Sequence, residues 1–133
     1  MMLMPPPITN PITPMMPTHT PTMRVTGKGI MFSREAATLL GAVPGTRISI
    51  EREPDPSHLY LYVKVVPTSG FVLFPQNRRL VAWSRSLARR ILTLTECSRR
   101  QALYRLGEPT YDRIGHRIVP IITSIDYAER NQV

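Results

Sequence analysis

Arginine side chains crowd one stretch of this sequence, and their type and spacing suit a defined chemistry. Positions 78–105 contain eight arginines and a single acid, Glu96. A guanidinium group binds phosphate through two hydrogen bonds and stacks on bases, and each phosphate that it neutralises releases counterions. We therefore expect a nucleic-acid-binding site, with DNA favoured over RNA. The predicted site residues are Arg78, Arg79, Arg85, Arg89, Arg90, Arg99, Arg100 and, from the first half of the chain, Lys28.

Two aromatic residues lie among these arginines and extend the hypothesis. Trp83 and Tyr104 could stack on bases if they are exposed. The alternative is a solvated basic surface with both aromatic residues in the core, in a chain whose arginine content reflects an arginine-rich host proteome. The scarcity of lysine, which occurs only at positions 28 and 64, agrees with that alternative.

The other residues that carry chemistry form no recognisable catalytic or metal-binding pattern. No spacing of His, Cys, Asp and Glu fits a zinc site, and no phosphate-binding glycine loop or nucleophile motif is present. We therefore expect neither an enzyme nor a bound metal or cofactor. The isolated candidates are interpreted as turn histidines (His58, His116), an apolar filler (Cys97) and a solvated loop (Glu51, Glu53, Asp55).

Composition limits the class of protein. The chain has 133 residues, enough for one domain, and a formal net charge of +8. Its hydrophobic content of 42% can form a folded core, but no apolar run approaches the ~20 residues that a membrane-spanning helix needs. The single cysteine excludes a disulfide scaffold and fits a reducing compartment. These features predict a cytoplasmic protein without membrane contact.

Residues 1–22 differ from the rest of the chain. They contain 7 of the 14 prolines and 5 of the 7 methionines, and no charged residue. Proline removes backbone donors and disfavours helix in the residue before it, so we expect a disordered tail. Either this tail is a Pro/Thr-rich tether or translation begins at Met23. The folded domain is expected to cover 23–133.

Short apolar segments between turn residues predict strands, and two longer segments predict helices. Ser33 and Ser84 stand where N-caps are expected, and Gly41 stands where the first helix should end. The fold class is therefore α+β. The predicted helices are 34–40 and 85–94, and the predicted strands are 24–26, 30–32, 47–52, 59–64, 71–74, 79–83, 100–106 and 118–122.

The order of these elements repeats along the chain. A shift of 51 positions aligns the two N-cap serines and places Phe32 on Trp83. Each half, 23–66 and 70–123, has the order β–β–α–β–β, and one half alone is too small to bury much core. We expect a tandem repeat whose halves form one barrel-like sheet with two helices about a pseudo-twofold axis. Chance similarity between two Ser-capped helices is the alternative.

Four features of the first half form a known pattern. They are the strand at Ile30–Phe32, a helix ending in Leu40-Gly41, a turn at Pro44-Gly45 and a strand at Ile48–Ile50. This pattern resembles the AbrB-like (SpoVT/AbrB) DNA-binding module, which forms a swapped-hairpin barrel, and MraZ proteins carry two such units in one chain. The sequence is also similar to uncharacterised small proteins of gut bacteria and their mobile elements.

The resemblance implies that cations before the central strand and arginines within the helix face DNA. The second half keeps these residues as Arg79, Arg89 and Arg90, whereas the first half keeps only Lys28. The resemblance therefore implies that the second half dominates DNA binding. We predict that these three arginines lie on one exposed face together with Arg78 or Arg85. Arg85 is the first residue of the second predicted helix.

Two functions remain open from the sequence. The first is a small DNA-binding protein, either a transcription regulator or a mobile-element accessory factor, that is a monomer or a homodimer. The second is a non-enzymatic structural or adaptor protein of a phage or conjugation system, with the Pro-rich segment as its tether. Arginines gathered on one face favour the first function, and arginines paired with acids favour the second.

Overall fold

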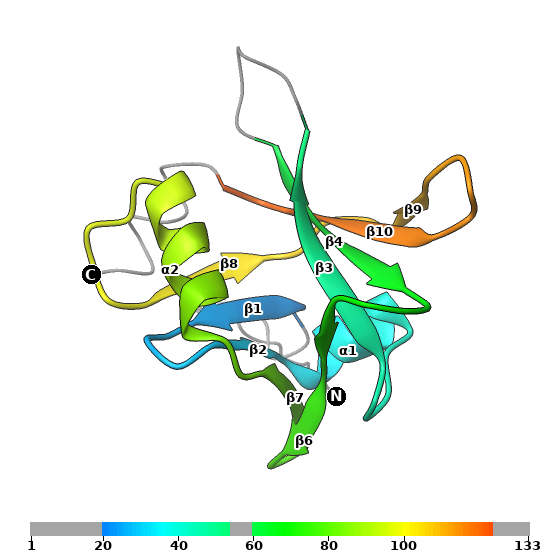
Figure 1. Cartoon of the computed structure of the whole chain (residues 1–133), viewed down its shortest axis with the longest axis horizontal. Helices are drawn as coiled ribbons and strands as arrows, with labels where there is room; N and C mark the ends of the chain where they lie inside the picture. Colours follow the sequence, from blue (N-terminus) through cyan, green and yellow to red (C-terminus); the bar gives the residue numbers. More distant parts are fainter. Residues whose placement is uncertain (1–19, 54–59, 124–133) are drawn as a thin grey trace, which may run out of the picture.

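The computed structural model describes residues 20–53 and 60–123 and has the expected α+β fold (Figure 1). Its strands form two antiparallel sheets of five strands each, where the sequence predicts one barrel-like sheet. Most of the expected tail, the hairpin loop at 54–59 and the terminal segment 124–133 lie outside the described residues.

Each sheet combines strands from both halves of the chain. The first sheet has the strand order β6-β7-β2-β1-β8, and the second has the order β5-β3-β4-β10-β9. The contacts between halves are therefore backbone hydrogen bonds between strands as well as core packing. The strands are β1 (Thr22–Val25), β2 (Ile30–Phe32), β3 (Arg47–Arg52), β4 (Leu61–Val66), β5 (Phe71–Val72), β6 (Phe74–Gln76), β7 (Arg79–Ala82), β8 (Ala102–Arg105), β9 (Thr110–Tyr111) and β10 (Arg117–Ile121).

Both helices begin and end as the sequence predicts. The first, α1, spans Arg34–Leu40, and the second, α2, spans Arg85–Leu94. Ser33 Oγ accepts a hydrogen bond from the Ala36 N–H at 3.1 Å, and Ser84 Oγ accepts one from the Leu87 N–H at 3.1 Å. Each cap satisfies a backbone donor that the first helical turn leaves without a partner.

A single cluster of buried apolar side chains joins both sheets and both helices. Alternate strand residues enter this core because successive side chains of a strand point to opposite faces. Five helical side chains face the core. Leu40, Leu87 and Ile91 are buried, and Leu39 and Leu92 are half-buried against the core.

One predicted strand belongs to both sheets. The segment 71–74 divides at the buried Leu73, because β5 pairs with β3 whereas β6 pairs with β7. The Leu73 N–H donates to the Thr46 carbonyl at 2.9 Å, so the chain stays bonded as it crosses between sheets. A bridge between Leu106 and Ile121 joins the sheets at a second point.

One strand, β9, was not predicted, and the bounds of β1, β4, β7, β8 and β10 differ from the prediction by one or two residues. The strand β9 has only two residues, too few for a periodic pattern. The strand β1 begins at Thr22, one residue inside the expected tail, and the Thr22 N–H donates to Ser33 Oγ at 3.0 Å. The folded domain therefore includes Thr22.

Candidate nucleic-acid interface

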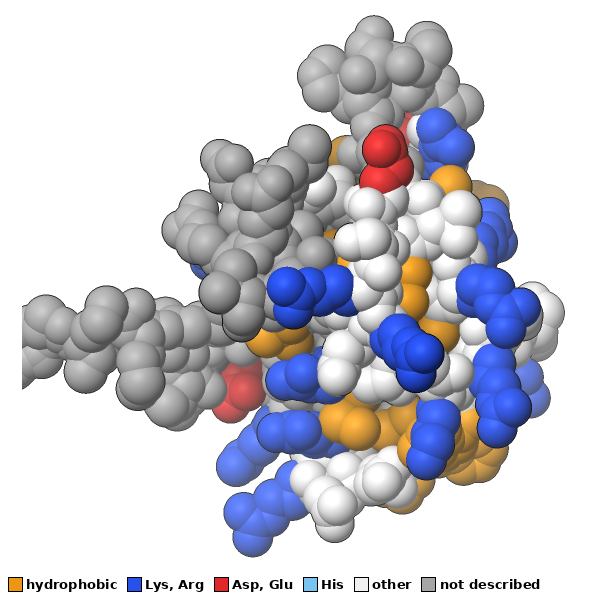
Figure 2. Space-filling view, turned by 90° about the vertical axis from the view of Figure 1, so that its left-hand side faces the viewer, with side chains coloured by type: hydrophobic (Ala, Val, Ile, Leu, Met, Phe, Trp, Pro, Cys, Tyr) orange, Lys and Arg blue, Asp and Glu red, His pale blue; other side chains and the backbone are white. Residues whose placement is uncertain are grey.

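All eight residues predicted to bind nucleic acid are exposed. Figure 2 faces the end of the molecule that carries α2 and the turn between β1 and β2, and its blue Lys and Arg side chains have little red between them. Ion pairs between described residues occur at the second sheet, where Lys64 pairs with Glu51 and Asp112. None of the eight predicted cations takes part in these pairs.

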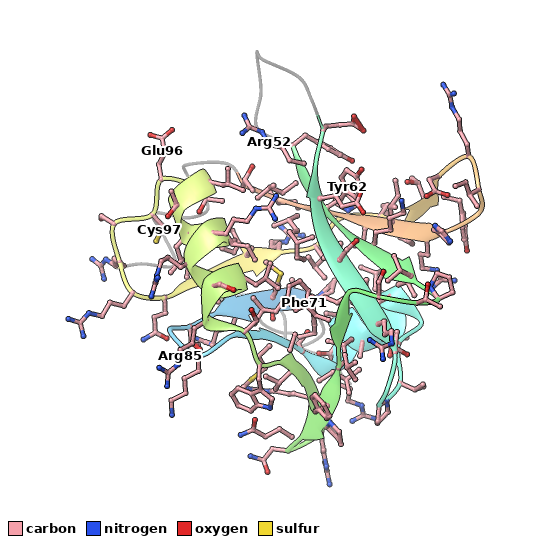
Figure 3. All side chains as sticks on the ribbon, in the orientation of Figure 1. Arg52, Tyr62, Phe71, Arg85, Glu96 and Cys97 are labelled. Atoms are coloured by element: carbon pink, nitrogen blue, oxygen red, sulfur yellow. The ribbon has the colours of Figure 1, made fainter. Side chains whose placement is uncertain are left out.

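Lys28 and Arg85 come together at the start of α2. Gly29 packs so tightly against the chain leading into the helix that a Cβ there would overlap the Ala82 carbonyl oxygen. Lys28 precedes this contact and Arg85 follows it, so both cations lie in one region. Arg89 lies one turn further along α2, and the first turn of the helix has no acid. Figure 3 shows Arg85 at this end of the helix.

Arg99 and Arg100 lie beyond the other end of α2, in the loop that leads to β8. The loop runs back from the end of α2 to Ala102, which is opposite Val25 beside the β1–β2 turn, so it returns toward the end of the sheet that carries Lys28. Glu96 lies just beyond the last residue of α2, as Figure 3 shows. The helix itself carries Arg89 and Arg90.

Arg78 lies at the tip of the two-residue turn between β6 and β7. Asn77 and Arg78 have φ angles of 49° and 66°, the positive values that a type I′ turn requires. Glycine is the preferred residue at the second position of such a turn, so Arg78 holds a strained backbone. Arg79 begins β7, and its Nη1 lies 3.6 Å from Met31 Sδ on β2.

The strand register brings further arginines to the side of the first sheet that faces away from the core. Directly opposite residues of antiparallel strands share a face. Arg24 is opposite both Met31 and Leu103, and Met31 is opposite Val81. Arg79, two residues before Val81, is on the same side. We name this surface the basic sheet face. It comprises Arg24, Met31, Phe74, Arg79, Val81, Trp83, Leu103 and Arg105.

Arg24 was not among the residues predicted from sequence, and Arg105 was counted in the basic stretch without being assigned to the site. The signal for Arg24 is its position between Met23 and Val25, which are both buried while Arg24 is exposed. Alternation within a strand therefore identifies Arg24, whereas its place on the same face as Arg79 depends on strand pairing that is not visible in the sequence.

Two exposed aromatic side chains lie on the basic sheet face. Phe74 is 51% exposed and is opposite Val81, whereas Trp83 is 52% exposed and directly follows β7. Trp83 is two residues beyond Val81, so strand alternation places it on the same side. Tyr104 is fully buried, and its hydroxyl lies 2.6 Å from Thr95 Oγ1, so it is not available for stacking. Phe74 was not among the residues predicted from the sequence.

Asp112 and Lys64, at the second sheet, stabilise the turn between β9 and β10. Asp112 Oδ1 accepts hydrogen bonds from the N–H groups of Ile114, Gly115 and His116, and Lys64 Nζ lies 3.2 Å from Oδ2. Desolvation alone would raise the pKa of Asp112, but these hydrogen bonds lower that pKa to about 2. The hydrogen bond with Asp112 also raises the pKa of Lys64.

Within residues 20–53 and 60–123, no group of three or more His, Cys, Asp and Glu side chains is placed to hold a metal ion. Neither helix in these ranges has the length and apolar composition to cross a membrane. His58 and Asp55 lie outside the described residues. Comparison with known proteins finds no matching family model, no matching curated protein and no matching solved structure.

Proposed function

We propose that this protein binds nucleic acid, DNA in preference to RNA, through the exposed cations of α2, the adjoining turns and the basic sheet face. The observation that carries the proposal is that all eight predicted cations are exposed and none pairs with an acid in the ion pairs of the described residues. Arg85 and Arg89 stand one turn apart and repel by a few tenths of a kcal/mol, which a bound phosphate would offset.

The salt dependence of DNA binding tests this proposal. The full chain should bind a fluorescein-labelled duplex, and the affinity should fall steeply between about 50 mM and about 200 mM salt. The double substitution Arg89→Ala and Arg90→Ala should weaken binding and reduce the salt slope by roughly one unit per lost phosphate contact. Arg113→Ala, an exposed arginine of the β9–β10 turn, is the matched control. Equal affinity and slope in the double variant would contradict the proposal.

We further propose that the domain is a duplicated β–β–α–β–β unit of the AbrB-like kind, related by a pseudo-twofold axis. The elements β1, β2, α1, β3 and β4 have the same order as β6, β7, α2, β8 and β10, although β3 pairs with β4 whereas β8 pairs with β1. Two pairs of corresponding strands, β2 with β7 and β4 with β10, are hydrogen-bonded neighbours, as a twofold axis between them requires. A fragment of residues 20–66 should then be unfolded or dimeric, and a folded monomer would contradict the duplication.

The burial pattern changes the alignment of the two halves by one residue. Phe32 is fully buried whereas Trp83 is exposed, so these residues are not structural equivalents. The register pairs Ile30 with Ala82 and Phe32 with Leu80 on the core side of the sheet. In the proposed duplication, Trp83 is therefore an extra residue between β7 and its helix.

A regulator or mobile-element accessory factor acting in the cytoplasm, as a monomer or homodimer, is the role that DNA binding suggests. The second candidate is a structural or adaptor protein of a phage or conjugation system. Exposed apolar side chains near β9 favour this candidate, because Tyr111 is 61% exposed and Ile114 is 79% exposed. A chain that fails to bind nucleic acid even at low salt would leave the adaptor as the better reading.

A further inference from the structure

We propose that the basic sheet face binds single-stranded nucleic acid, with bases stacked on Phe74 and Trp83 and phosphates held by the surrounding arginines and Lys28. The inference rests on the proposed function and names the form of nucleic acid that this face takes. It requires exposed rings, cations around them and a reason to prefer unpaired bases.

The rings lie along one strand and its neighbour. Arg79, Val81 and Trp83 alternate on the outer side of β7 and its extension, and they span about 13 Å. Phe74 lies across from Val81 on β6, and Val81 is only 2% exposed, so the two exposed rings flank a buried apolar position. Large aromatic side chains left half-exposed on a sheet are a typical feature of binding surfaces.

Cations surround the rings. The Arg79 guanidinium lies against Met31 Sδ at 3.6 Å, which holds it over the sheet beside Val81. Near the other ring, a Cβ built on Gly29 would lie 3.1 Å from the Trp83 Cα, so the adjacent Lys28 lies close to Trp83. Arg24 is two strands away from β7 on the same side. This arrangement places positive charge near both exposed rings.

Unpaired bases suit this surface better than a duplex does. A duplex keeps its bases stacked and presents phosphates, which arginines contact but aromatic rings do not. Single strands expose base faces that stack on aromatic side chains with little regard to sequence, while a basic surface follows the backbone. Of the two forms of nucleic acid, only a single strand therefore offers the rings of the basic sheet face a stacking partner.

The fluorescence of Trp83 tests the inference directly, because this residue is the single tryptophan of the chain. The full chain is titrated with oligo(dT), with a duplex of equal nucleotide content and with inorganic polyphosphate. Oligo(dT) should quench Trp83 emission, whereas the duplex and polyphosphate should leave it unchanged. Anisotropy of labelled oligonucleotides gives the affinities in parallel.

Substitution of the other ring provides an independent measurement. Phe74→Leu should lower the affinity for oligo(dT) about five-fold to a hundred-fold and leave duplex affinity unchanged. Tyr111→Leu, which removes an exposed ring from the other sheet, is the matched control and should change neither affinity. Because Phe74 and Tyr111 are exposed, both variants should fold, which circular dichroism checks.

The possible results separate this inference from the proposed function. If oligo(dT) binds without quenching Trp83, or if Phe74→Leu binds it normally, the stacking surface is wrong while nucleic-acid binding stands. If the duplex or polyphosphate quenches Trp83 as strongly as oligo(dT), the preference for single strands is wrong. If neither nucleic acid binds at low salt, the inference and the proposed function both fail.

Discussion

The hydroxyl of Tyr104 lies 2.6 Å from Oγ1 of Thr95, and this contact ties the end of α2 to β8. Thr95 Oγ1 donates to the Ile91 carbonyl at 2.9 Å, so Tyr104 is the donor in the contact between the hydroxyls. Tyr104→Phe leaves Thr95 with its own acceptor, and it should lower the free energy of unfolding by about 1 kcal/mol. Urea unfolding measures the loss. Unchanged stability would show that the hydrogen bond is not formed in solution.

The same tyrosine should make the fold sensitive to alkali. Burial raises the pKa of Tyr104 above the ordinary value for tyrosine. The folded state then holds this proton more tightly than the unfolded state, so the stabilisation is complete below about pH 10 and declines as the pH rises further. The difference in unfolding free energy between the parent and Tyr104→Phe should therefore shrink from about pH 10 upward. A constant difference would contradict the prediction.

Acid should weaken the turn that Asp112 organises. Because the pKa of Asp112 is lowered to about 2, its carboxylate stabilises the fold above about pH 4 and progressively less as the pH falls toward 2. Asp112→Asn keeps an acceptor for the turn but removes the charge opposite Lys64. The variant should be less stable at neutral pH and should lose less stability on acidification. Glu108→Gln, an exposed acid, is the control, and parallel pH profiles for parent and Asp112→Asn would refute the prediction.

Two glycines of one turn should respond differently to the same substitution. A Cβ on Gly29 would meet the backbone of Ala82 and Ser84, whereas a Cβ on Gly27 has no atom within 4 Å. Gly29→Ala should destabilise the fold by about 1–3 kcal/mol, and Gly27→Ala should stay within about 0.5 kcal/mol of the parent. Thermal unfolding of both variants measures the contrast. Equal stability would mean that the turn does not pack against the start of α2.

Arg78 should show a conflict between stability and binding. Its φ of 66° favours glycine, so Arg78→Gly should stabilise the protein by about 1 kcal/mol. The same change removes one exposed cation, so DNA affinity should fall and the salt slope should decrease by about one unit. Arg78→Lys keeps both the charge and the strain, and it should resemble the parent in stability. A Gly variant that binds DNA like the parent would remove Arg78 from the interface.

Local chemistry made most elements predictable from the sequence. Ser33 and Ser84 identified both helix starts, and Gly41 identified the end of the first helix. In the structure Gly41 has a left-handed φ of 67°, which glycine adopts without strain. The alternation of apolar and polar residues in β3 and β4 predicted the two strands that form the longest hairpin. The division at Leu73 was not predictable, because it depends on which strand each side of the residue meets in space.

The candidate site was predictable only in part for the same reason. Charge density alone identified the exposed arginines of α2 and the β6–β7 turn. Trp83 is exposed whereas Tyr104 is buried, and this difference depends on their places in the folded sheet. Arg24 and Arg79 are far apart in the sequence, and only the order of the strands shows that they share a face.

The pairing of β1 with β8 has a consequence for how the chain folds during synthesis. Thr22 is opposite Arg105, so β1 finds this outer partner only after the residues up to β8 have emerged from the ribosome. Pairs so distant in sequence incur a large loop-closure entropy before they gain contacts, which makes folding slow. Until then the outer edge of β1 presents unpaired backbone groups, and such edges promote aggregation. A nascent chain that ends before β8 therefore exposes a strand edge that the folded protein covers.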